Sequence, residues 1–314
     1  WLKLFCLKTA MWSRRVLHRH AVMIRHLLPN TCQRAWTGSG DCHRTVFSNI
    51  SVALRRATGI AEPQFVTAND HRFFVMTNGS GSPVLCMPGA LGTAETDFFK
   101  QLASDGLAAQ HRVVSFDPRG YGKSRPPTRS WPVDFYRRDA EDAASIMQAL
   151  GCESYDVMGW SDGANAAVLL ASAHKQAVRK LVIFGGNAWV EQEDIDSYEQ
   201  TRDVTKNWSK RMLDMHLPVY GDDLQPMWSA FCDAMQGIMA RGGNICQDEA
   251  KSLSCPTLVL AGAKDPIVPL FHPEWFGANI PNARLHVFPD GKHNIHIKYA
   301  EEFNRLVLSF LAEE

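Results

Sequence analysis

Short apolar runs alternate with longer segments of helical period along most of this chain. Runs of about five apolar residues predict buried strands, and apolar residues spaced three and four apart predict amphipathic helices. The predicted strands are 64–68, 72–77, 83–87, 112–116, 155–158, 181–184, 257–261 and 285–288. The predicted helices are 97–109, 134–150, 164–173 and 300–311. This alternation indicates an α/β fold whose mostly parallel sheet carries helices on both faces.

Two segments depart from the simple alternation. The first two strands flank Asn69-Asp70, which predicts a hairpin. Residues 187–253 contain no strand pattern and are rich in Trp and Met at helical spacing. We interpret this segment as a helical cap inserted between two strands, although Met and Trp at such spacing also fit ordinary helical packing.

Charge divides the chain into two parts, although the net formal charge of its 314 residues is zero. Residues 1–61 hold ten of the 33 basic residues but only one of the 33 acidic residues, Asp41. An Arg-rich, acid-poor segment with interspersed apolar residues is typical of a mitochondrial transit peptide. We therefore expect residues 1–61 to direct the protein to mitochondria and residues 62–314 to form the domain.

Other interpretations of this N-terminal segment stay open. It could be a disordered basic arm on a cytoplasmic protein, or Met11 could be the true start, which would make residues 1–10 a translation artefact. No stretch approaches the ~18 apolar residues of a membrane span. The acidic body and the lack of a nucleic-acid-binding motif in the basic segment argue against nucleic-acid binding.

The eight cysteines show neither a C-x-x-C pair nor the spacing of a zinc site. Cys86 and Cys255 lie in apolar runs, as small buried hydrophobic residues do. Unpaired cysteines suit a reducing compartment such as the cytosol or the mitochondrial matrix.

The strongest chemical signal is the sequence G-x-S-x-G at 159–163, with Ser161 at its centre. It lies between the predicted strand 155–158 and the predicted helix 164–173. A serine on such a tight strand-to-helix turn exposes its hydroxyl, and the flanking glycines allow neighbouring backbone to pass close by. The position therefore predicts a nucleophilic serine.

A serine nucleophile needs a base, and the base needs an orienting acid. In folds with this turn the chain order is serine, acid, histidine. Asp265 follows the strand 257–261, and His293 follows the strand 285–288. The carboxyl ends of parallel strands meet at one edge of a sheet, so we predict a triad of Ser161, Asp265 and His293.

Two neighbouring residues offer alternatives. Asp290 is a rival acid, but it lies only three residues before His293 and fits a turn with Gly291. His296 forms an H-x-x-H pattern with His293, which is a weak metal signal because no third ligand is evident. We predict neither a metal nor a cofactor.

The tetrahedral intermediate of acyl transfer requires an oxyanion hole. We predict that one donor is the backbone N–H of Asp162, the residue after the nucleophile. The other should come from the loop at 88–92, with Ala90 as first choice and Leu91 as second.

Asp162 is unusual, because a carboxylate beside a developing oxyanion repels it. A position at a helix N-terminus stabilises a carboxylate by only ~0.3–1 kcal/mol. A compensating cation is the more economical explanation, and a substrate ammonium near the scissile acyl group would supply it. The residues thus hint at an ester or amide with an α-amino group.

Several motifs together resemble the α/β-hydrolase family over about residues 62–311. They are PGALG at 88–92, FDPRGYGKSRPP at 116–127, GWSDG at 159–163, NIC at 244–246, KDPIVP at 264–269 and GKHNIH at 291–296. The second motif is common across the family, whereas GWSDG with KHN-x-H is more specific and resembles members that act on α-amino-acid esters. The N-terminal 61 residues match no motif.

The resemblance implies an α/β-hydrolase fold and hydrolysis of small α-amino-acid esters. It also implies that Ser161 is the nucleophile, His293 the base and Asp265 the orienting acid, and that Asp162 binds the substrate ammonium. We expect a monomer that binds a small-molecule ester and neither nucleic acid nor membrane. A hydrolase of C–C bonds in ring-cleavage products, or a ligand receptor on the same scaffold, is the alternative.

Overall fold

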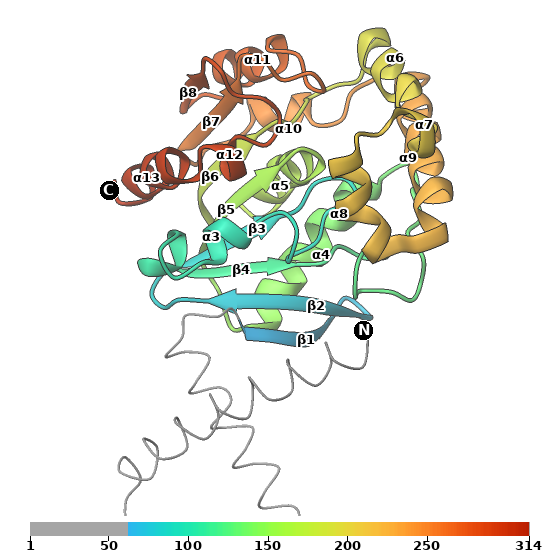
Figure 1. The fold of residues 1–314 in the computed structure, drawn as a ribbon. Helices are drawn as coiled ribbons and strands as arrows, with labels where there is room; N and C mark the ends of the chain where they lie inside the picture. The colour runs from blue at the N-terminus through green and yellow to red at the C-terminus, as the bar shows by residue number, and fades with distance from the viewer. Residues whose placement is uncertain (1–61, 314) are drawn as a thin grey trace, which may run out of the picture. The chain divides into compact units, whose positions relative to one another are not determined.

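The structure is a computed structural model, and it describes residues 62–313. The predictions for the N-terminal segment, including Cys6, Cys32 and Cys42, lie outside the described residues. A single open sheet runs through the described part of the chain (Figure 1).

The sheet contains eight strands in the order β1-β2-β4-β3-β5-β6-β7-β8. The strands are β1 (Glu62–Ala68), β2 (His71–Asn78), β3 (Pro83–Met87), β4 (Arg112–Phe116), β5 (Tyr155–Trp160), β6 (Val178–Phe184), β7 (Thr257–Gly262) and β8 (Ala283–Phe288). β2 pairs antiparallel with β1 and β4, and all other pairs are parallel. The predicted hairpin and mostly parallel sheet are therefore confirmed.

Helices cover both faces of this sheet. The longer helices of the body are α4 (Phe135–Ala149), α5 (Asp162–Ala173), α11 (Phe271–Asn279) and α13 (Ala300–Leu311), and the shorter elements are α3 (Phe99–Leu102), η1 (Leu107–Ala109) and α12 (Ile295–Lys298). One apolar cluster joins the sheet to α4, α5 and α11, and a second joins it to α3 and α13. This is the predicted arrangement.

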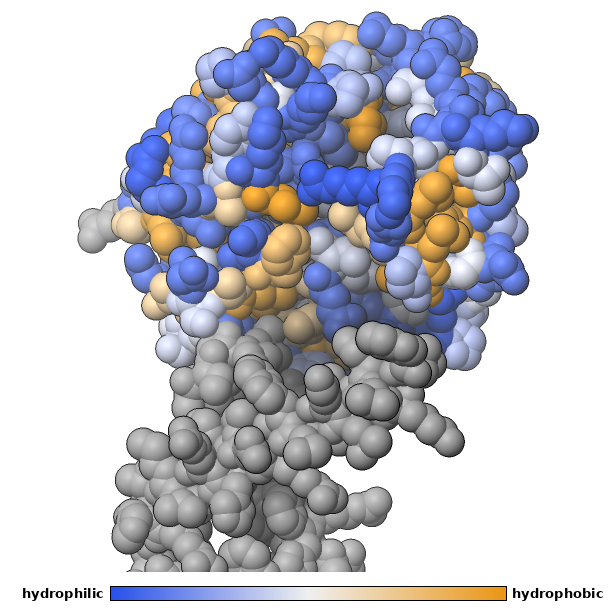
Figure 2. Space-filling view, in the orientation of Figure 1, coloured by the Kyte–Doolittle hydropathy of each residue, from blue (hydrophilic) through white to orange (hydrophobic). Residues whose placement is uncertain are grey.

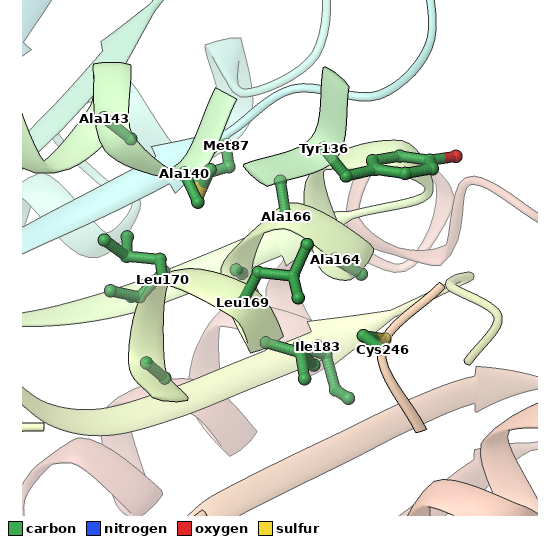
Figure 3. Packing of buried hydrophobic residues seen from close by; sticks show 14 of the residues in the cluster. Met87, Tyr136, Ala140, Ala143, Ala164, Ala166, Leu169, Leu170, Ile183 and Cys246 are labelled. Atoms are coloured by element: carbon green, nitrogen blue, oxygen red, sulfur yellow. The ribbon is translucent and has the colours of Figure 1, made fainter. Parts of the chain in front are cut away.

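Small side chains bring α5 close to its neighbours. Every residue from Gly163 to Ala171 is buried, and alanine occupies four of these nine positions. Figure 3 shows Ala164, Ala166 and Leu169 packed among residues of α4 and the strands. The tight packing of α5 fixes the turn that precedes it.

The segment between β6 and β7 is helical, with α6 (Gln192–Gln200), α7 (Val204–Asn207), α8 (Lys210–Tyr220), η2 (Gly221–Asp223), α9 (Leu224–Met239) and α10 (Gln247–Lys251). Helices α6 to α9 lie together beyond one end of the sheet, and the arrowheads of β4 and β5 point toward them (Figure 1). A buried pair anchors this region, since Asp194 of α6 lies 3.2 Å from His272 of α11. The insertion therefore stands over the carboxyl ends of the strands.

One predicted element is wrong in part. The helix expected over 97–109 is broken into α3 and η1. Ala103 is extended at ψ 148°, and a Cβ on Gly106 would lie 2.2 Å from the carbonyl oxygen of Lys100. The chain turns sharply here, so the helical period cannot continue.

The surface in view is largely polar, with apolar residues in scattered patches (Figure 2). None of the helices within residues 62–313 is long and apolar enough to cross a bilayer. The cysteines in this range are all free, and Cys86 is fully buried as predicted, whereas Cys255 is half-buried.

Candidate active site

The predicted site residues gather at the carboxyl ends of four strands. The loop after β3 contains Ala90 and Leu91, Ser161 follows β5, Asp265 follows β7 and His293 follows β8. The strand order reverses between β3 and β5, because β4 lies on one side of β3 and β5 on the other. Open α/β sheets place their sites at such a reversal.

Ser161 has the strained backbone that the turn requires. Its φ is 55° and its ψ is −124°, a conformation that a residue with a side chain rarely adopts. A Cβ on Gly163 would lie 2.0 Å from the carbonyl oxygen of Met87, so the turn accepts only glycine at that position. The backbone N–H of Ser161 donates to the carbonyl of Phe184 at 2.9 Å, which holds the turn against β6.

Asp265 and His293 form a close pair although 28 residues separate them. Nδ1 of His293 lies 2.8 Å from Oδ2 of Asp265. The other carboxylate oxygen accepts the backbone N–H groups of Ile267 and Val268 at 2.9 and 3.1 Å. These bonds fix the carboxylate, and the carboxylate in turn orients the imidazole through Nδ1. Nε2 of His293 is therefore available for another partner.

His293 also lies beside the serine turn. Trp160, which precedes Ser161, has its ring centroid 5.3 Å from that of His293 and donates from Nε1 to the His293 carbonyl at 3.0 Å. A Cβ on Gly185 would approach Cε1 of His293 to 3.0 Å. The described residues include no hydrogen bond between His293 and the Ser161 hydroxyl, and catalytic hydrogen bonds often tighten only with substrate bound.

The two rival residues have other partners. Asp290 is exposed and forms an ion pair with Lys264 at 2.5 Å, which lowers the pKa of Asp290. His296 is fully buried, and its Nε2 lies 2.9 Å from the carbonyl oxygen of Asp97. Among residues 62–313, no group of three or more His, Cys, Asp or Glu residues could hold a metal ion.

The loop after β3 lies against the nucleophile. A Cβ on Gly89 would lie 3.1 Å from Cβ of Ser161. Leu91 has φ 58°, and the N–H of Gly92 donates to the carbonyl of Gly89 at 3.0 Å, which closes a turn over Ala90. The N–H groups of Ala90 and Asp162 meet no acceptor within the described part of the chain.

A buried carboxylate supports this loop. Asp97 accepts the N–H of Gly89 at 3.0 Å and the hydroxyl of Thr96 at 2.7 Å. Burial raises the pKa of Asp97 to about 7, although both hydrogen bonds lower it. Nothing in the local sequence pattern around Asp97 predicts its contact with a loop eight residues upstream.

Asp162 is half-buried at the start of α5, and the hydroxyl of Tyr136 donates to its Oδ1 at 2.8 Å. Burial raises the pKa of Asp162 to about 6, against the hydrogen bond from Tyr136 and the positive charge of Arg129, which lower it. Within the described residues, Oδ2 of Asp162 receives no hydrogen bond. One carboxylate oxygen is therefore held and the other is open to a ligand.

A buried ion pair lies next to Asp162. Arg129 binds Asp139 through two hydrogen bonds of 2.7 and 2.5 Å, and its side chain is 1% exposed. Arg129, Asp139 and Asp162 line one small cavity together with Tyr121. Arg129 thus supplies part of the positive charge near Asp162 that the sequence alone would assign to a substrate. Two carboxylates against one guanidinium still leave a net negative charge.

Comparison with known proteins identifies the family of this chain. Residues 84–306 match the model of the alpha/beta hydrolase family. The chain belongs to this family. It is 39% identical over 256 residues to serine hydrolase BPHL of Mus musculus, covering 81% of this chain and 87% of that protein. The human BPHL protein is 40% identical over 252 residues, covering 78% of this chain and 85% of that protein. The motifs predict these relatives, biphenyl hydrolase-like protein or valacyclovir hydrolase, and the prediction is confirmed.

More distant relatives share the fold. A 2-hydroxy-6-oxononadienedioate/2-hydroxy-6-oxononatrienedioate hydrolase of Pseudomonas putida is 31% identical over 259 residues, covering 76% of this chain and 86% of that protein. The solved structure of a meta-cleavage product hydrolase from Pseudomonas fluorescens IP01 matches with a TM-score of 0.66 at 22% identity, covering 79% of this chain and 97% of that chain. The family model and the two BPHL relatives establish a hydrolase of the serine class, and the solved structures agree with the α/β-hydrolase fold.

Proposed function

We propose that this protein hydrolyses small α-amino-acid esters through an acyl-enzyme. Ser161 attacks the ester carbonyl while His293 accepts its proton, and Asp265 holds the imidazole in the required tautomer. The backbone N–H groups of Ala90 and Asp162 bind the oxyanion, with Leu91 as the alternative donor. His293 then protonates the departing alcohol, and water releases the amino acid by the reverse sequence of proton transfers.

The ammonium preference depends on the charge around Asp162. Its free Oδ2 lies on the residue that follows the nucleophile, so a cation bound there would be near the reacting acyl group. The neighbouring Arg129 and Asp139 neutralise each other, and the cluster keeps one net negative charge. An α-ammonium group on the substrate completes the charge balance, whereas an anionic acyl group is repelled.

Paired esters test this proposal. Asp162→Ala should lower kcat/KM by more than about two orders of magnitude for an aminoacyl ester, because removing one member of a desolvated charge pair costs ~3–5 kcal/mol. The acetyl or propionyl ester of the same alcohol should change little. Equal losses on both esters would contradict the ammonium role.

A C–C bond hydrolase is the second candidate, because relatives at 28–31% identity carry names of ring-cleavage hydrolases. Their dienone acid substrates are anionic, and Asp162 would repel them. Rapid cleavage of a dienone acid without aminoacyl esterase activity would favour this second function. A non-catalytic receptor is tested separately, since a fluorophosphonate that fails to label Ser161 would support it.

The N-terminal segment and the self-contained domain bear on where the protein acts and on its oligomeric state. We infer mitochondrial import through residues 1–61, and a monomeric enzyme without cofactor, metal, nucleic acid or membrane partner. Import of a fusion carrying these 61 residues into isolated mitochondria tests the location. A fusion that stays outside the isolated mitochondria would contradict import and favour the alternative, a cytoplasmic protein.

A further inference from the structure

We propose that Tyr136 is a specificity-determining residue, because its hydroxyl orients the Asp162 carboxylate and keeps it available for a substrate ammonium. This inference rests on the proposed function and names a residue that the sequence motifs do not contain. Its basis is the hydrogen bond of 2.8 Å from Tyr136 Oη to Asp162 Oδ1.

The phenol is held firmly in place. Tyr136 is buried in the first turn of α4, and its ring centroid lies 4.0 Å from that of Phe135. Its hydroxyl also lies 3.9 Å from Sδ of Met235 on α9, so both the body and the insertion enclose it. Figure 3 shows the ring at the edge of the aliphatic cluster, with its oxygen directed away from the cluster. The direction of the donated hydrogen bond is therefore set by packing.

The choice of a phenol has an electrostatic consequence. A lysine or arginine at this position would neutralise Asp162 and compete with the substrate cation. A hydroxyl stabilises the anion without cancelling its charge. It occupies Oδ1 and leaves Oδ2 unbonded among residues 62–313, which is the oxygen that an incoming ammonium can reach. The Tyr136 hydroxyl thus favours the ionised form of Asp162 and fixes the orientation of its carboxylate.

Other charged groups around Asp162 are fixed by their own partners. From the loop before α4, Arg129 lowers the pKa of Asp162, and Asp139 on α4 raises it, but the two are bound to each other. From the loop after β8, His293 lowers it and is held by Asp265. On α6, burial raises the pKa of the Tyr198 phenol well above its usual range, so this group stays neutral. Tyr136 is the neighbour that donates directly to the carboxylate.

Tyr136→Phe removes the hydroxyl and keeps the ring. We expect kcat/KM for an aminoacyl ester to fall about tenfold at neutral pH, mostly through KM, with less than a twofold change for the matching propionyl ester. The pKa of Asp162 should rise without its donor. The ratio of aminoacyl to propionyl kcat/KM should therefore begin to fall at a higher pH than in the wild type.

Tyr155→Phe is the matched control. Tyr155 is a buried residue at the start of β5, at the opposite end of the strand from Ser161, and its hydroxyl makes no hydrogen bond in the described structure, so the ratio and its pH dependence should not change. Incorporation of 3-fluorotyrosine at position 136 provides a second measurement that preserves the fold. The fluorinated phenol is a stronger donor, and it should shift the pH dependence of the ratio downward.

Asp162→Asn, measured on the same two esters, separates the inference from the proposed function. One outcome is that Asp162→Asn loses kcat/KM selectively on the aminoacyl ester while Tyr136→Phe loses none, or loses it equally on both esters. Either result for Tyr136→Phe overturns the role of Tyr136 and leaves the ammonium role of Asp162 intact. The role of Tyr136 is also overturned if the pH dependence of the ratio is unchanged in both Tyr136→Phe and the 3-fluorotyrosine protein. A non-selective Asp162→Asn effect overturns the ammonium role itself. Selective losses in both variants, with opposite pH shifts for Phe and fluorotyrosine, support the proposal.

Discussion

His296 Nε2 donates to the backbone carbonyl oxygen of Asp97 at 2.9 Å. Asp97 in turn accepts the backbone N–H of Gly89 through its carboxylate, and His296 lies three residues after His293. This contact therefore joins the loop of the predicted oxyanion donor to the loop of the predicted base. Burial lowers the pKa of His296 to about 3, so the imidazole stays neutral and acts as a fixed donor.

Substitution of His296 tests this connection. His296→Phe keeps the aromatic packing against Trp160 and Phe184 but leaves the Asp97 carbonyl without its donor. We expect kcat to fall about tenfold on aminoacyl and propionyl esters alike, with KM within twofold, because the two loops lose their common support. The free energy of unfolding should fall by about 1–3 kcal/mol.

His286→Phe is a suitable control for this substitution. His286 lies on the edge strand β8, and its ring contacts Phe288 without a hydrogen bond in the described structure. The control should retain kcat. An unchanged kcat in His296→Phe as well would show that the contact has no bearing on the reaction.

The triad residues of this site can be predicted from the sequence because their signals are local. An apolar run followed by G-x-S-x-G predicts Ser161 as the nucleophile, and strand ends predict Asp265 and His293, whose side chains lie 2.8 Å apart in the structure. No such signal predicts Tyr136 or Asp97, because their contacts join residues that no periodic pattern relates. His296 shows only a weak metal pattern in the sequence, and its contact with Asp97 likewise depends on the fold.

The raised pKa of Asp162 predicts that kcat/KM depends on pH in a way that cationic substrates show and neutral ones do not. Its pKa is raised to about 6 by burial, so protonation removes the negative charge as the pH falls through that value. The ratio of kcat/KM for an aminoacyl ester to that for its propionyl analogue should therefore decline below about pH 6. Effects of pH on the chemical steps that both esters share cancel in the ratio. A ratio that stays constant from about pH 7 to about pH 5 would contradict this prediction.

Buried carboxylates also predict an unusual dependence of stability on pH. Burial raises the pKa of Asp97 to about 7 and that of Asp117 to about 6, above their value of 3.8 in the unfolded chain. The folded state then binds more protons than the unfolded state between these values. The contribution of these groups to the free energy of unfolding therefore decreases as the pH rises from about 4 through about 7.

Asp97→Asn removes one of these titrations. Between about pH 5 and pH 8, chemical denaturation should show a smaller decrease in the free energy of unfolding than in the wild type, by about 1 kcal/mol or more. Asp290→Asn, which changes an exposed carboxylate whose pKa is lowered by Lys264, should leave that decrease as it is. Equal slopes in wild type and Asp97→Asn would refute the assignment.

Gly185 offers a direct test of the position of His293. It follows β6 with φ 61°, and an added Cβ would lie 3.0 Å from Cε1 and 3.2 Å from Nδ1 of the imidazole. Gly185→Ala should displace the ring and lower kcat by about 10²-fold on both ester classes, since a shift of about 1 Å in a reacting group has effects of that size. Gly151 has a similar φ of 71°, but a Cβ added there would meet nothing within 4 Å. Gly151→Ala should lower the free energy of unfolding by about 1–2 kcal/mol through the same backbone strain as Gly185→Ala, but it should keep full activity. If both variants lose only stability, His293 is not the base, or its ring tolerates a displacement that the proposed mechanism forbids.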